Sequence, residues 1–131
     1  MSAVGYGYGA ALLVMGVLDA LWLGVVARDL YRREIGELMA ANVRILPAAL
    51  FYFGYPAGIV ALALQPQPES MAMAAWRSAL VGLVAYGTYD LTNMATLRQW
   101  SVTLTLADIA WGAFASALAG TAAFAAMQRA S

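Results

Sequence analysis

The chain has 131 residues, of which 63% are hydrophobic and only 11% charged, and its net charge is zero. Soluble domains carry about a quarter charged residues, so this composition and a mean hydropathy of +0.73 exclude an ordinary soluble fold. Cysteine and histidine are absent, which excludes disulfides, a thiol nucleophile, an imidazole base and the usual zinc or haem ligands. The basic residues are scattered arginines without a basic patch, so we expect no nucleic-acid partner.

The first apolar segment, residues 4–27, contains a single charged side chain, Asp19. At ~1.5 Å per residue, a helix of this length crosses the ~30 Å hydrocarbon core of a bilayer. The segment lacks the positively charged start of a signal peptide and exceeds the length of its apolar region, so we do not expect cleavage. We therefore predict a first transmembrane helix.

The next segment, residues 28–44, holds half of the charged side chains of the chain. Its apolar residues recur at helical spacing, at Tyr31, Ile35, Leu38 and Met39, while the charges take the other side. This pattern predicts an amphipathic helix at the membrane surface. We interpret it as a charged connector; the alternative is a surface for a substrate or partner.

Three further apolar segments follow, at residues 45–64, 73–97 and 102–127. Pro56 falls inside the first of them and should kink the helix and free a carbonyl group. The polar, proline-rich residues 65–70 indicate a tight loop. The predicted fold is therefore all-α, a single membrane domain over residues 1–131 that forms a compact bundle of four transmembrane helices with a short amphipathic connector.

Orientation is predicted by the arginines near the helix ends, because cytoplasmic connections are enriched in them. The first and third connections, at 28–44 and 98–101, together carry more arginines than the second connection and the two termini. We expect a multi-pass protein of the inner (cytoplasmic) membrane, with these two connections in the cytoplasm and both termini outside.

Each predicted helix carries a polar group at a similar depth. Asp19, Asp90 and Asp108 each lie eight or nine residues from the same membrane face, ~12 to 14 Å in at the helical rise, and Tyr52 of the second span is level with them. A carboxylate inside a bilayer costs several kcal/mol, so intramembrane acids usually serve a function. We predict that the helices converge on one polar site near the cytoplasmic side.

Neighbouring residues extend this predicted site along the same helix faces. Tyr86, Asp90 and Asn93 form a stripe at helical spacing, and both Asp19 and Asp108 are followed three residues later by a tryptophan whose N–H is a hydrogen-bond donor. Trp22 could instead mark the headgroup level. The candidate ligand-binding residues are Asp19, Trp22, Tyr52, Tyr86, Tyr89, Asp90, Asn93, Thr105, Asp108 and Trp111.

Three functions fit these residues. The first is the binding or transport of a small cationic ligand, a proton or a metal ion, where a metal held by Asp19, Asp90 and Asp108 would be a hard cation such as Mg²⁺, Ca²⁺ or Mn²⁺. The second is an enzyme acting on a lipid, isoprenoid or fatty acyl group, with Asp90 or Asp108 as acid or base and Tyr86, Tyr89 or Tyr52 as proton donor. The third is a structural or accessory role, in which the polar residues specify helix packing. No cofactor motif is present.

Four runs of sequence resemble a known family. GVLDALWLG, YFGYPAG, YGTYDLTNMATLRQW and DIAWG occur in an order and spacing similar to the DUF2177 family of small predicted bacterial membrane proteins, and the similarity covers nearly the whole chain. The resemblance implies a compact four-span protein, and it implies no activity or catalytic residues.

Small residues also line one face of the last predicted helix. Gly112, Ala115, Ala119 and Ala123 are spaced by three or four residues, which suits close helix packing in lipid. The face could pair two copies in a homodimer, or it could pack inside one chain. The lipid bilayer is the remaining expected partner.

Overall fold

The computed structural model describes residues 2–40 and 44–130, and within these residues it contains helices and no strands. The predicted all-α class is confirmed. The elements are α1 (Ala3–Leu21), the π-helix η1 (Trp22–Val26), α2 (Arg28–Ile35), the 3₁₀-helix η2 (Gly36–Leu38), α3 (Ile45–Ala63), α4 (Met71–Thr96) and α5 (Val102–Ala130).

Serine side chains define the starts of the two longest helices. Ser70, the last residue of the predicted loop, accepts a hydrogen bond from the backbone N–H of Met73 at 3.1 Å. Ser101 does the same for the N–H of Leu104 at 3.0 Å. These bonds satisfy amide groups that have no partner within the helix, so α4 and α5 begin where the sequence supplies a cap.

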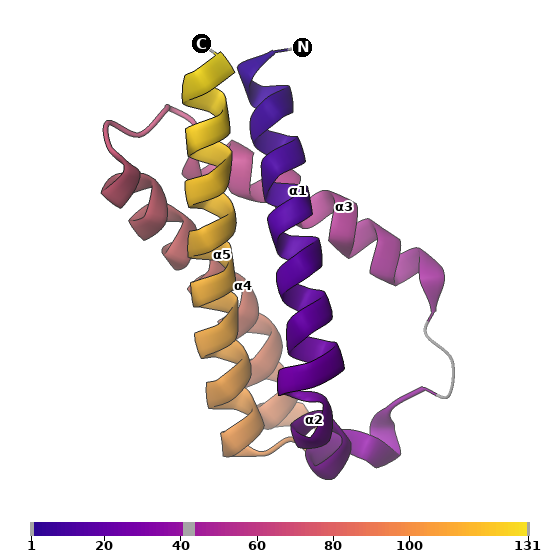
Figure 1. Cartoon of the computed structure of the whole chain (residues 1–131). Helices are drawn as coiled ribbons and strands as arrows, with labels where there is room; N and C mark the ends of the chain where they lie inside the picture. Colours follow the sequence, from indigo (N-terminus) through magenta and orange to yellow (C-terminus); the bar gives the residue numbers. More distant parts are fainter. Residues whose placement is uncertain (1, 41–43, 131) are drawn as a thin grey trace.

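The long helices pack around α5 (Figure 1). Helix α1 runs antiparallel beside α5, so that both termini lie at one end, and α4 packs against α5. Helix α3 crosses the group obliquely, and α2 lies at the end opposite the termini (Figure 1). Tyr8 of α1 donates a hydrogen bond to the carbonyl of Phe53 in α3 at 2.8 Å. The helix α3 is continuous through the buried Pro56.

Small residues allow α4 and α5 to approach closely. A Cβ atom added at Gly82 would lie 2.4 Å from the Gly112 carbonyl oxygen, and one at Gly120 would lie 1.7 Å from Ser78 Oγ. Three alanines on the same face of α5 are fully buried: Ala115, Ala119 and Ala123. The face of small residues that was predicted on this helix therefore packs inside the chain and offers no surface to a second copy.

Three helical segments of the described residues are long and apolar enough to cross a membrane: Ala3–Val26, Ile45–Ala63 and Val102–Ala130. Helix α4 occupies the position of the third predicted span, 73–97, but Arg77, Asp90 and other polar residues lower its mean hydropathy, so the four-span count is not confirmed. Large apolar side chains are nevertheless exposed on the bundle, including Val84 of α4 at 67%. Such a surface suits lipid rather than water.

The predicted connector forms two elements. Helix α2 ends at Ile35 and η2 continues to Leu38, and residues 41–43 lie outside the described part of the chain. The π-helical turn between α1 and α2 was not predicted from the sequence. It ends at Val26, and the N–H of the following residue, Ala27, donates to the Trp22 carbonyl at 2.7 Å.

Candidate functional site

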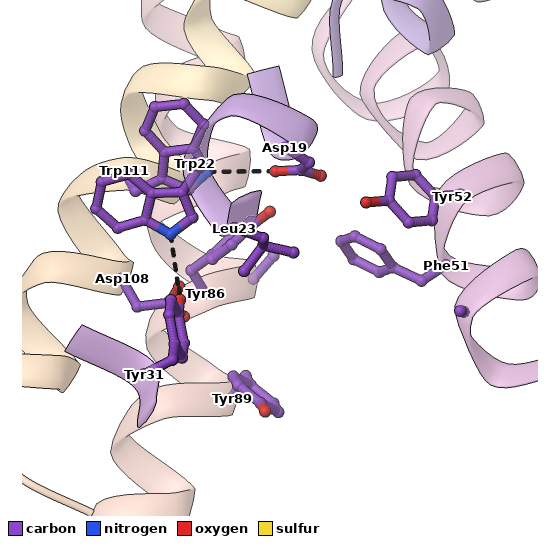
Figure 2. A pocket seen from close by; sticks show the side chains of 12 residues that line it. Asp19, Trp22, Leu23, Tyr31, Phe51, Tyr52, Tyr86, Tyr89, Asp108 and Trp111 are labelled. Carbon is purple, nitrogen blue, oxygen red and sulfur yellow. Dashed lines mark hydrogen bonds between the residues drawn. The ribbon is translucent and has the colours of Figure 1, made fainter. Parts of the chain in front are cut away.

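A cavity of about 550 Å³ opens between α1, α3, α4 and α5, with α2 at one side. Every long helix contributes to its wall, and most of its lining side chains are aromatic (Figure 2). The lining residues are Asp19, Trp22, Leu23, Tyr31, Ala48, Phe51, Tyr52, Ala85, Tyr86, Tyr89, Asp108 and Trp111.

Asp19 contributes a carboxyl group that is held from one side only. Its Oδ1 atom accepts a hydrogen bond from the indole N–H of Trp111, on α5, at 3.3 Å. Figure 2 shows the carboxyl group pointing across the cavity toward the hydroxyl of Tyr52 on α3. The side chain is only 6% exposed, so a ligand would reach the carboxyl group through the cavity.

Asp108 is held by a chain of donors that starts on η1. The indole N–H of Trp22 donates to the Tyr31 hydroxyl at 3.3 Å, and that hydroxyl donates in turn to Asp108 Oδ1. Trp22 also stacks on Trp111, with ring centroids 4.6 Å apart and planes within 5° of parallel. Asp19 and Asp108 thus each receive a hydrogen bond from another helix, whereas the sequence suggested the tryptophan three residues further along as the donor.

Tyr31 is the polar residue of the site that sequence reasoning missed; the apolar lining residues Leu23, Ala48, Phe51 and Ala85 were not predicted either. The helical pattern places it on the apolar face of the connector. Its hydroxyl group, which can form a hydrogen bond, is the feature that distinguishes it from the other residues of that face. Burial raises the pKa of the Tyr31 phenol above its ordinary value, and the hydrogen bond to Asp108 raises it further. The hydroxyl therefore stays neutral at physiological pH and remains a donor to Asp108.

The α4 side of the cavity is a tyrosine wall. Tyr86 packs edge-on against Tyr55 of α3, with centroids 6.0 Å apart, and Tyr89 packs edge-on against Trp100 at 5.6 Å. The ring of Tyr86 lies where a Cβ atom of Gly112 would be, 2.1 Å from its Cγ. Only a glycine at this position of α5 leaves room for that ring.

Three of the predicted site residues do not line the cavity. Asp90 is fully buried, and neither of its carboxyl oxygens has a hydrogen-bond partner among the described residues. Its electrostatic neighbours are Asp108 and Trp100, whose indole N–H also has no acceptor there. Thr105 is buried and donates to the Ser101 carbonyl at 2.8 Å. Asn93 is half-buried beyond the cavity.

The three aspartates do not form a metal site. Across residues 2–40 and 44–130, no group of three or more His, Cys, Asp or Glu side chains is arranged to hold a metal ion. Asp19 and Asp108 share the cavity, whereas Asp90 lies behind its wall. Of the residues considered for acid, base or proton-donor roles, Asp108 and the tyrosines at 52, 86 and 89 reach the cavity and Asp90 does not.

A comparison with protein families matches residues 4–125 to DUF2177, described as a predicted membrane protein. No curated protein and no solved structure shows a significant match to the chain.

Proposed function

Because the chain belongs to the DUF2177 family of predicted membrane proteins, we propose that it is a membrane protein that binds a small organic cation in the aromatic cavity, with Asp19 as the counter-charge. The observation that carries this proposal is the Asp19 carboxyl group, which is directed into a cavity of about 550 Å³ walled mainly by aromatic rings.

The chemistry of the wall favours a cation over a neutral or anionic ligand. The face of an aromatic ring attracts a cation by ~0.5 to 2 kcal/mol, most strongly for tryptophan and where water is excluded. Trp22, Trp111 and Tyr52 stand close to a carboxyl group, and among the described residues no basic side chain lines the cavity to repel a positive charge. The volume is within the ~300 to 1,000 Å³ typical of small-molecule sites.

An organic cation fits better than a hard metal ion. Mg²⁺ and Ca²⁺ take six or more oxygen ligands. Asp19 and Asp108 are the only carboxylates among the lining residues, and one oxygen of each is already hydrogen-bonded. A substituted ammonium group needs one counter-charge and apolar or aromatic surroundings, which is what the cavity provides.

The proposed placement in the membrane rests on the exposed surface of the helices and on the positions of the arginines. The exposed apolar side chains of α4 support its insertion beside the other three helices, which makes a four-span bundle. In this arrangement α2 and the α4–α5 connection lie together at the end opposite the termini (Figure 1). By the arginine rule that end faces the cytoplasm of the inner membrane, and the cavity lies near it.

Binding is tested with two probes of the same shape that differ in charge. Benzyltrimethylammonium and its carbon isostere neopentylbenzene are titrated against the full chain in lipid nanodiscs, with binding followed by calorimetry. We expect the cation to bind more tightly than the isostere. The Asp19→Asn substitution should weaken binding of the cation by about tenfold to a hundredfold, because the attraction to the counter-charge is lost, and leave binding of the isostere unchanged.

The matched control is Asp29→Asn, which removes an exposed carboxylate on α2 that does not line the cavity. Its affinity for the cation should equal that of the unsubstituted protein. Equal affinity for both probes, or an Asp19→Asn protein that binds the cation as well as the parent does, would refute the proposal.

A further inference from the structure

A second recess of about 490 Å³ lies where α2 and η2 meet the connection between α4 and α5. It is separate from the aromatic cavity, and the two share no lining residue. The recess is lined by Arg32, Arg33, Glu34, Gly36, Glu37, Arg98, Gln99, Trp100 and Ser101. Three of the seven arginines of the chain therefore meet in one place, although they come from segments more than sixty residues apart.

The three arginines are free to bind a ligand. Arg32, Arg33 and Arg98 are exposed, and none of their guanidinium groups is paired with a carboxylate in the described part of the chain. Of the two acids in the recess, Glu37 already accepts a hydrogen bond from the Gln99 amide at 2.8 Å. Both acids keep their negative charge, so Glu34 and Glu37 together oppose an anion, and the three arginines outnumber them.

The start of α5 adds to the positive character of the recess. Trp100 and Ser101 immediately precede α5, which runs from Val102 to Ala130. The first amide groups of a helix carry a partial positive charge that favours anions. Ser101 caps the N–H of Leu104, so the α5 amides ahead of Leu104 remain for another acceptor.

We propose that this recess binds a phosphate group, carried by the headgroup of an anionic phospholipid. Guanidinium groups form paired hydrogen bonds with phosphate oxygens, which a chloride ion cannot offer. The recess lies at the connector end of the bundle, where an apolar surface meets charged residues, and lipid phosphates occupy that level of a bilayer. The site does not depend on the cation proposal, because it uses none of the same residues.

The test compares three ligands on the full chain in detergent by native mass spectrometry: dihexanoyl phosphatidylglycerol, dihexanoyl phosphatidylcholine and inorganic phosphate. We expect phosphatidylglycerol to bind most tightly. Replacing Arg32, Arg33 and Arg98 together by alanine should weaken it by on the order of fivefold for each arginine. Arg129→Ala, at the opposite end of α5, is the matched control and should change nothing.

One substitution tests the site in the opposite direction. Glu34→Gln removes one of the two opposing charges and should tighten phosphatidylglycerol binding severalfold, a gain that a misfolded protein cannot produce. If inorganic phosphate binds as tightly as phosphatidylglycerol, the recess is a phosphate site, but its ligand is a free anion and not a lipid headgroup. The proposal is overturned if the triple variant keeps its affinity, if Arg129→Ala loses as much, or if phosphatidylcholine binds as well as phosphatidylglycerol.

Discussion

The contact between Gly112 and the ring of Tyr86 gives the sharpest test of the packing that builds the cavity. An added Cβ at Gly112 would lie 2.1, 2.3 and 2.6 Å from Cγ, Cδ1 and Cδ2 of Tyr86. These atoms belong to a rigid ring near its attachment to the chain, so they cannot yield as the end of a flexible side chain would. Gly112→Ala must therefore displace the ring or separate α4 from α5.

Two opposing effects decide the size of the change. Overpacking a well-packed site costs ~1 to 3 kcal/mol. Replacing glycine by alanine inside a helix returns up to ~1 kcal/mol of helix propensity. We therefore expect Gly112→Ala to lower the free energy of unfolding by about 1 to 2 kcal/mol, and to weaken cation binding because the ring leaves the cavity wall.

Thermal unfolding in detergent measures the stability effect, with Gly16→Ala as the control. A Cβ at Gly16 of α1 meets nothing within 4 Å, so this substitution should keep or raise stability. A double-mutant cycle then isolates the contact: in a Tyr86→Ala background, Gly112→Ala should cost nothing. The reasoning fails if Gly112→Ala is as stable as the parent, or if its cost is the same with and without the Tyr86 ring.

Two further substitutions test the polar groups beside the cavity. Asp90→Asn should leave thermal stability unchanged or raise it, because the buried carboxyl group has no hydrogen-bond partner to lose, and a clear destabilisation would show that Asp90 is a structural acceptor. Tyr31→Phe should lower the free energy of unfolding at neutral pH by ~1 to 3 kcal/mol, because Trp22 and Asp108 both lose their hydrogen-bond partner. Full retention of stability would contradict the observed chain of donors. Because the pKa of Tyr31 is raised in the folded state, its contribution is fully present below about pH 10, the pKa of a free phenol, and is lost as the pH rises further. The stability advantage of the parent over Tyr31→Phe should therefore shrink in alkaline solution, and an advantage independent of pH would contradict this assignment.

The sequence by itself determined the class of the protein. Long apolar segments and few charges predict membrane helices, because composition and helical rise act locally and need no knowledge of how the helices pack. The same rise placed Asp19, Tyr52 and Asp108 at one level along their helices, and these side chains do line one cavity. The depth of a residue along a helix axis can be predicted from the sequence because each residue advances the helix by a constant ~1.5 Å.

Only the tertiary structure decided which way each group faces and what it touches. Asp90 shares the level of the other aspartates but turns behind the cavity wall, because the direction of a side chain depends on the rotation of its helix against its neighbours. Tyr31 reaches Asp108 from a connector 77 positions away, and Arg98 joins the arginines of α2 in one recess. Such pairings arise from packing between distant segments, and no local pattern of residues encodes them.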